Sequence, residues 1–386
     1  MLKNLLTVCV AAMFTVAGYA AAVELRQGHP DVYVVVKGDT LWDIAGRFLK
    51  RPWLWPEIWQ ANPHIENPHL IYPGDVLSLA YLGDGSARVT TTQRIRREPL
   101  PVPAVPLSAV EAFLRDLRII DRAQLERLPY VISLEEDRLR GVSGHLAYVR
   151  GMPEARPGEV YTILRPIQQY SRSQRNAGNF IPRSSGLDFR GNVDHRDWSA
   201  HWFDVMHARD DQPEFLGVEL MAITDATVTR GEGHGIEVTT LLLADQGKEV
   251  RAGDVIAATH AHPYDLSFFP HPPAAVGEYG EYRVLAVSQA LRFGGPMQVV
   301  AITGGTREGI DPGTTFSVWR EGRNVADDVA HANKLKADND RVRVPDEFAG
   351  HVMVFRSFDR ISYGLVMEAI KPVGVGYHLK HPDATR

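Results

Sequence analysis

The stretch VYVVVKGDTLWDIAGRFL, residues 32–49, decides the fold of the N-terminal part of the chain. Its β-branched run over residues 32–36 predicts a strand, and the following letters KGDT predict a turn. Asp39 or Thr40 is suited to cap a helix expected over residues 41–49. The apolar positions of this helix are spaced to face one core: Trp42, Ile44, Ala45 and Phe48.

The next thirty or so positions predict a second helix and a returning strand. The helix is expected over residues 56–62, and Tyr72-Pro73-Gly74-Asp75 predicts a tight turn that leads into a strand over residues 76–79. The order of elements is therefore strand, helix, helix, strand.

Four of the seven tryptophans of the chain fall in this small region. Trp42 and Trp59 are expected to pack in its core. Trp53 and Trp55 alternate in the connector between the helices, and two alternatives stay open for them. Either both pack inside, or one is exposed as a surface on which a ligand can stack.

These blocks resemble the LysM (lysin motif) family. The matching blocks occur in the order of the family, over residues 33–35, 37–45, 60–65 and 70–77, and only the connector over residues 49–55 departs from it. The resemblance implies a small βααβ module over residues 31–81 that binds glycan containing N-acetylglucosamine, which in a bacterium is peptidoglycan.

The resemblance also implies where the glycan binds. The groove of the family lies between the first strand–helix turn and the loop before the last strand, where glycines let the backbone come close to a ligand. Of the residues carried over, Leu41, Ile71 and Tyr72 are expected to touch sugar, whereas Asp39 is explained mainly by a capping role. The full set comprises Gly38, Asp39, Thr40 and Leu41 on one wall and Asn62, Pro63, Ile71, Tyr72 and Pro73 on the other.

The first residues predict export. Lys3 precedes an apolar run over residues 5–17, and small residues follow, which is typical of a cleavable signal peptide over residues 1–22. A membrane anchor that is retained at the N-terminus is the alternative. The single cysteine, Cys9, lies inside this segment, so a mature periplasmic protein would have no thiol for a disulfide or a nucleophile.

Charge argues against nucleic acid as a partner. The chain has 42 basic and 47 acidic residues, and no basic stripe runs along it. A polar and then proline-rich stretch over residues 82–106 predicts a semi-rigid linker.

The remainder predicts an α+β chain that is mostly β. One amphipathic helix is expected over residues 108–127. A middle domain is expected over residues 107–270, with a long polar insertion at 166–198, and a C-terminal domain over residues 275–386. Short apolar runs between glycine and proline predict strands at 146–149, 160–164, 218–223, 236–243, 255–258, 284–288, 299–303, 316–319, 351–355 and 363–370.

Three of these strands share a short sequence motif that places a glycine two residues before the strand. The glycines are Gly158, Gly253 and Gly313, and each is available for a positive φ angle in a tight turn. The motif indicates either a repeated small β unit or turns that recur in any β-rich domain.

An enzyme is the main alternative to a binding protein, because LysM modules are often fused to wall hydrolases. His207 and Asp211, with His260 and His262, formally echo the ligands of zinc endopeptidases. The surrounding sequence lacks the glycines and the apolar strand of those enzymes, and Pro263 follows directly. We therefore expect no catalysis, no cofactor and no metal.

The whole chain resembles the type IV pilus secretin-associated proteins, whose C-terminal part is similar to the C-terminal domain of a flagellar T-ring protein. This resemblance implies a wall-bound periplasmic protein that partners the outer-membrane secretin ring; a generic wall-binding structural protein is a further alternative. It is carried by residues 300–305, 309–313, 350–356 and 363–366.

Overall fold

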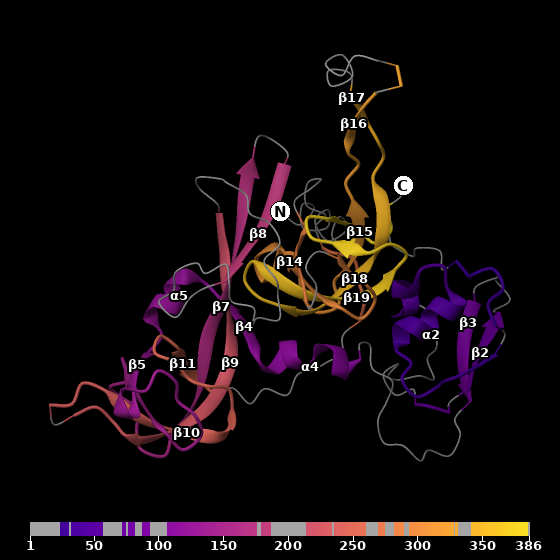
Figure 1. Cartoon of the computed structure of the whole chain (residues 1–386). Helices are drawn as coiled ribbons and strands as arrows, with labels where there is room; N and C mark the ends of the chain where they lie inside the picture. The colour runs from indigo at the N-terminus through magenta and orange to yellow at the C-terminus, as the bar shows by residue number, and fades with distance from the viewer. Residues whose placement is uncertain are drawn as a thin grey trace, which may run out of the picture. The chain divides into compact units, whose positions relative to one another are not determined.

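A computed structural model describes most of the chain after the expected signal peptide. The described residues form parts of two compact units, Met1–Ala104 and Val105–Arg386 (Figure 1), and each unit is considered by itself. They comprise residues 24–30, 32–56, 72–74, 76–81, 87–92, 106–175, 179–186, 214–233, 235–259, 269–274, 282–288, 293–327, 329–330 and 341–384. The expected signal peptide lies outside them.

The first unit has an antiparallel three-stranded sheet in the order β1-β2-β3, with α2 and a short 3-10 helix, η1. The first strand, the first helix and the returning strand predicted from sequence are confirmed, whereas all but the first residue of the second predicted helix lie outside the described residues. The bounds are β1 (Val32–Val34), α2 (Leu41–Phe48), η1 (Pro52–Leu54), β2 (Val76–Tyr81) and β3 (Ala87–Thr92).

Strand β3 lies inside the range that was predicted as a linker, residues 82–106. Its six residues pair with the whole of β2, from Val76 opposite Thr92 to Tyr81 opposite Ala87. The sequence ARVTTT favours this strand, because its Val and Thr side chains are β-branched and fit a pleated sheet.

The single helix predicted over residues 108–127 is wrong. The chain forms α4 (Leu107–Arg115), β4 (Leu117–Ile120) and α5 (Arg122–Arg127) instead. The sequence LRII pairs with a long neighbouring strand. Asp121 then starts the new helix through a capping box with Gln124.

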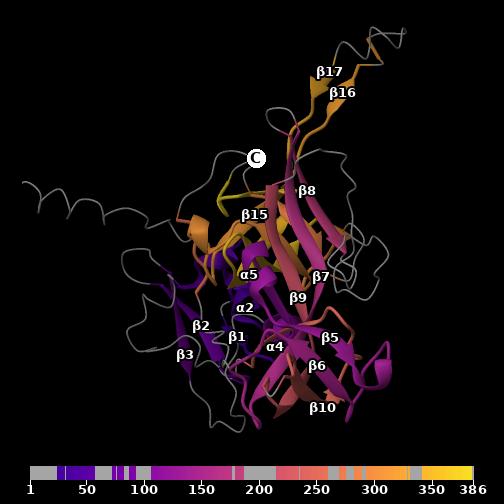
Figure 2. The same cartoon turned by 90° about the vertical axis from the view of Figure 1, so that its left-hand side faces the viewer.

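The middle of the chain forms a closed six-stranded antiparallel barrel, the first barrel (Figure 2). Around the barrel the strands follow the order β5-β6-β10-β9-β7-β11, and β11 pairs back with β5. The bounds are β5 (Tyr130–Leu134), β6 (Leu146–Arg150), β7 (Val160–Arg175), β9 (Glu214–Arg230), β10 (Thr239–Gly247) and β11 (Val255–Ala258).

Strands β7 and β9 continue beyond the barrel as an extension sheet in the order β4-β9-β7-β8. The range 166–198, predicted as a long polar insertion, begins inside β7 and includes β8 (Asn179–Gly186). The extension sheet buries polar groups as well as apolar ones. Tyr170 and Glu219 are fully buried, and the tyrosine hydroxyl donates to the carboxylate.

The C-terminal region forms a second barrel. Its sheet has the order β12-β14-β19-β18-β15-β21, and Val284 and Leu379 close the ring by donating to the carbonyls of Tyr377 and Tyr282 at 3.0 and 2.9 Å. The bounds are β12 (Val284–Val287), β14 (Val299–Thr303), β15 (Thr315–Arg320), β18 (Glu347–Ser357), β19 (Ile361–Ala369) and β21 (His378–Lys380).

The two barrels have the same connectivity. When the six strands of each are numbered in chain order, both rings run 1-2-5-4-3-6. The same hydrogen-bonded pair marks the entry to strand 3: Gly158 donates to the carbonyl of Val228, as Gly313 does to Val354, both at 2.8 Å.

The entries to strands 2 and 6 match as well. Gly253 donates to Val131 at 2.8 Å, as Gly376 does to Val284. Gly144 donates to Leu243 at 3.1 Å, and Met297 to Val366 at 2.8 Å. In each of these pairs, the residue whose carbonyl accepts from the turn glycine or Met297 also donates its N–H to the carbonyl of the next turn residue. The two rings can therefore be aligned residue by residue.

The short motif that precedes three of the strands is therefore the same tight turn each time. Gly158, Gly253 and Gly313 have φ of +92°, +91° and +103°, as predicted. Gly158 and Gly313 also stand at equivalent points of the two barrels, which favours the repeated-unit interpretation.

All ten apolar runs predicted as strands overlap strands of the structure. The chain is accordingly mostly β, as predicted. Within the described residues, no helix combines the length and the apolar character that crossing a membrane would need.

Candidate functional site

The first wall of the predicted groove is a turn that Asp39 holds together. Its carboxylate accepts from the backbone N–H of Val36 at 2.8 Å and from the hydroxyl of Tyr33 at 2.9 Å. Gly38 has a φ of +100°, which a residue with a side chain adopts at a cost. The turn is thus fixed by its own residues before any ligand arrives.

Tyr33 joins this turn to the helix. The guanidinium of Arg47 lies 4.6 Å from the centre of its ring. Burial raises the pKa of the Tyr33 hydroxyl, and the hydrogen bond to Asp39 raises it further. The phenol therefore stays a donor to Asp39 at neutral pH.

Thr40 is the N-cap of α2, so the prediction that Asp39 is explained mainly by capping this helix is wrong. Its hydroxyl accepts from the N–H of Asp43 at 3.1 Å, and the carboxylate of Asp43 accepts from the N–H of Thr40 at 3.2 Å. This capping box satisfies two backbone donors at the end of the helix that faces the groove.

The second wall contacts the first through the backbone. The N–H of Gly74 donates to the carbonyl of Val35 at 2.8 Å, so the turn that contains Tyr72 and Pro73 lies beside the turn that contains Gly38. A side-chain carbon placed at Gly38 or Gly74 would meet no atom within 4 Å. Both glycines therefore border open space in the described structure, and their φ angles, +100° and +93°, favour glycine.

The predicted site residues differ in their exposure. Gly38 is exposed, and Asp39, Tyr72 and Pro73 are half-buried. Asn62, Pro63 and Ile71 lie outside the described residues, and Thr40 is buried in its capping box.

Leu41 differs from its expected role as a sugar contact. It is fully buried, because as the first residue of α2 its side chain packs into the core with Ile44 and Ala45.

Both tryptophans of the connector, for which two alternatives were left open, are buried. Trp53 and Trp55 are 6% and 1% exposed, and the rings of Trp42 and Trp53 lie 6.2 Å apart. Helix η1, which begins at Pro52, turns the connector inward. The alternative in which one of them forms an exposed stacking surface is therefore wrong, and Trp42 packs in the core as predicted.

An exposed valine row on β1 and the residues after it was not predicted from the sequence. Val32, Val34 and Val36 are 54%, 49% and 57% exposed, whereas Val35 is buried. The alternation of a strand was the signal that could have separated the two sides.

An N-terminal segment also completes the module. The N–H of Arg26 donates to the carbonyl of Phe48 at 2.9 Å, and Lys50 forms an ion pair with Glu24 at 2.8 Å. The ion pair lowers the pKa of Glu24. Residues 24–30 thus stabilise the end of α2 that lies away from the groove.

The predicted groove has the chemistry of a recognition site. Its described part presents backbone donors and acceptors, a half-buried tyrosine and a proline ring, which suit the hydroxyls and weakly apolar faces of sugar rings. The described residues contain no group of three His, Cys, Asp or Glu side chains that could hold a metal ion. The formal zinc ligands His207, Asp211, His260 and His262 lie outside those residues.

Comparison with known proteins identifies the family of this module. A stretch of 60 residues is 40% identical to the uncharacterized protein YqbP of Bacillus subtilis (strain 168); the match covers 13% of this chain and 27% of that protein. Residues 33–80 match the model of the LysM domain family. The chain therefore contains a LysM domain, a module that binds the glycan strands of peptidoglycan and is not catalytic.

Proposed function

We propose that this protein is a non-catalytic periplasmic protein that grips peptidoglycan through its LysM domain and anchors an outer-membrane machine, the type IV pilus secretin, to the cell wall. The observation that carries the proposal is the pair of hydrogen-bonded turns around Gly38 and Gly74. They form two adjacent walls with open space beside both glycines.

The division of the chain into two compact units supports an anchor rather than a stand-alone binder. The first unit contains the groove, and residues Val105–Arg386 form a second body of their own. That body contains the residues whose pattern resembles the secretin-associated proteins and the T-ring domain. We infer that it docks protein while the LysM domain holds the wall, after a signal peptide over residues 1–22 has directed export.

Sedimentation with purified peptidoglycan sacculi tests the wall-binding part. Gly74→Ala adds a side chain beside the groove, and Gly28→Ala is a matched control. Gly28 also has a positive φ, of +76°, and also has no atom within 4 Å of an added side chain, but it lies in the N-terminal segment. We expect wild type and Gly28→Ala to sediment equally, and Gly74→Ala and Tyr72→Ala to bind roughly tenfold less, a loss of about 1.4 kcal/mol.

Two outcomes would contradict the proposal. Equal sedimentation of all variants would show that the groove is not the grip, and muropeptides released into the supernatant would indicate a hydrolase. A separate capture of solubilised secretin by the full chain tests the anchoring part. Wall binding without capture would leave a structural wall binder unrelated to pili.

A further inference from the structure

The second barrel carries a two-stranded arm that projects away from it (Figures 1 and 2). The arm comprises β16 (Asn324–Ala326), β17 (Arg341–Arg343) and the adjoining Val344. Val325 pairs directly opposite Val342, so these two side chains lie on one face, together with Val344 two residues further on. They are 43%, 57% and 39% exposed. The arm thus presents an uncovered apolar face.

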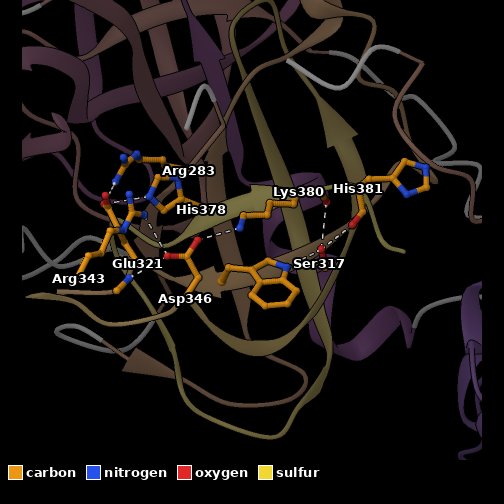
Figure 3. Close-up of polar contacts among 10 residues, drawn as sticks. Arg283, Ser317, Glu321, Arg343, Asp346, His378, Lys380 and His381 are labelled. Carbon is orange, nitrogen blue, oxygen red and sulfur yellow. Dashed lines mark hydrogen bonds and ion pairs between the residues drawn. The ribbon is translucent and has the colours of Figure 1, made fainter. Parts of the chain in front are cut away.

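The arm is held firmly at its base (Figure 3). Asp346 accepts from the N–H of Gly322 at 3.0 Å and from the ammonium of Lys380 at 2.9 Å. On the other strand, Glu321 contacts the buried His378 at 3.0 Å. A two-stranded ribbon alone is marginally stable in water, so this clamp fixes the direction of the arm.

The arm occupies a defined place in the repeated topology, because it connects strands 3 and 4 of its barrel, β15 and β18. The connection between strands 3 and 4 of the first barrel, β7 and β9, forms the extension sheet with the continuing ends of these strands, and β4 adds an edge strand to it. That sheet is covered. Ile167, Val218 and Leu220 are at most 2% exposed, and the Val218 face packs against α5 and the residues around it.

The other face of the extension sheet, together with α4, covers the outside of the second barrel. The ring of Phe113 lies 5.8 Å from the ring of Tyr363. A side-chain carbon at Gly217 would lie 3.6 Å from Ile361. Arg356 donates to three main-chain carbonyls at the end of α4 and the start of β4. Figure 1 shows α4 directly beneath β18 and β19.

The equivalent outer face of the first barrel is open. In each barrel one residue exchanges hydrogen bonds with the turn before strand 2: Leu243 in the first barrel and Val366 in the second. Leu242 and Leu365 directly precede these residues. Leu365 and Leu242 are therefore equivalent. Leu365 is fully buried, whereas Leu242 is 40% exposed.

We propose that the arm docks on the outer face of the first barrel of a second copy of this chain, next to Leu242. Within the described residues, the outer face of the second barrel is covered by the preceding repeat, whereas the equivalent face of the first barrel is exposed at Leu242. Likewise, the strand 3–4 connection of the first barrel covers a face, whereas the described part of the arm covers none. If the contact between the repeats is also made between two molecules, it covers the exposed face of the first barrel and the apolar face of the arm. Such a contact is heterologous, joining different surfaces of the two copies, so it builds a ring or an open filament.

Disulfide trapping tests this contact in the full-length protein. In a Cys9→Ser background, which removes the single cysteine of the chain, we would mix Val342→Cys with Leu242→Cys under mild oxidation. The expected result is about tenfold more covalent dimer than either protein forms alone, because docking raises the local thiol concentration. Val342→Cys mixed with Ile370→Cys is the control. Ile370 is 61% exposed, so chance collision would favour it over Leu242.

Sedimentation velocity provides a second measurement that needs no cysteine. We expect wild type to associate as concentration rises, and the Val325→Asp/Val342→Asp double variant to stay monomeric with an unchanged circular dichroism spectrum. A monomeric wild type with no trapped dimer would overturn the proposal. Covalent dimer from Val342→Cys alone would also overturn it, because it would show arms paired with arms.

Discussion

The two barrels share one strand connectivity but use its equivalent positions differently. The turn pairs of Gly158 with Val228 and of Gly313 with Val354 are the same in both. Outside these turns the residues diverge: the buried apolar Val255 of the first barrel stands where the second barrel has the buried His378. Backbone turns therefore maintain the repeat, while side chains differ according to what each barrel packs against.

The largest expected difference concerns the two turn glycines. In Gly313→Ala the added carbon would lie 2.2 Å from the carbonyl oxygen of Phe269, so the backbone must move. In Gly158→Ala it would meet nothing within 4 Å, and only the positive φ is unfavourable. We expect losses of unfolding free energy of roughly 4 kcal/mol and about 1 kcal/mol, respectively. Urea titration checks this; equal losses would contradict the assigned packing.

The next difference concerns two equivalent arginines. Arg356 and Arg230 each stand two residues after the valine that pairs with the strand 3 turn. Arg356 donates to the carbonyls of Phe113, Leu114 and Leu117 at 2.5, 2.8 and 2.7 Å, whereas Arg230 is exposed. We expect Arg356→Ala to lose about 2–3 kcal/mol and Arg230→Ala less than about 0.5 kcal/mol by urea titration. A loss from Arg356→Ala as small as that expected from Arg230→Ala would mean that the end of α4 does not depend on Arg356.

A smaller effect is expected at the buried pair of the extension sheet. Burial raises the pKa of Tyr170 well above its ordinary value, and the nearby Glu219 carboxylate raises it further. The hydroxyl therefore stays a donor to Glu219, and Tyr170→Phe would leave that buried carboxylate without it. We expect a loss of about 2 kcal/mol in thermal or urea unfolding. Tyr130→Phe, at a residue that is 42% exposed, should change little, and a neutral Tyr170→Phe would contradict this account.

The smallest effect is a pH dependence that the second barrel has and the first lacks at the same position. Burial lowers the pKa of His378 and Arg283 adds to this, although the hydrogen bond to Glu321 opposes it. As pH falls below about 6.5, the unfolded chain takes up a proton at this histidine before the folded chain does, so stability decreases. The slope from this group is at most about 1.4 kcal/mol per pH unit.

The substitution His378→Val places at this position the residue type of the equivalent Val255 in the first barrel, and it should remove that slope. Urea midpoints measured from pH 7 to pH 5 would fall less steeply for the variant than for wild type. Parallel curves would show that the folded and unfolded states bind protons alike at His378.

Local signals made the LysM domain predictable. The strand, the turn and the cap around Thr40 depend on neighbours within a few residues, and the family resemblance fixed their order. Burial was harder to infer. Leu41 begins a helix and was predicted as a groove residue, but the direction of its side chain depends on how α2 packs. Trp53 and Trp55 turn inward because of η1.

The barrels were predictable as strands but not as rings. Each apolar run marked a strand, yet pairing β11 with β5 or Tyr282 with Leu379 joins residues about a hundred positions apart, which no local pattern encodes. The break of the predicted helix at Asp116 arose likewise, because Leu117–Ile120 gains more by pairing with β9 than by continuing α4. The recurring glycine turn was the one local trace of the repeat.

Binding of a soluble N-acetylglucosamine oligomer to the full-length protein, measured by isothermal titration calorimetry, tests the central claim most directly. The account predicts saturable binding by wild type and by Gly28→Ala, and binding roughly tenfold weaker by Gly74→Ala. The absence of binding by wild type, or identical affinities for all three proteins, would contradict the claim that the turns around Gly38 and Gly74 form the glycan site.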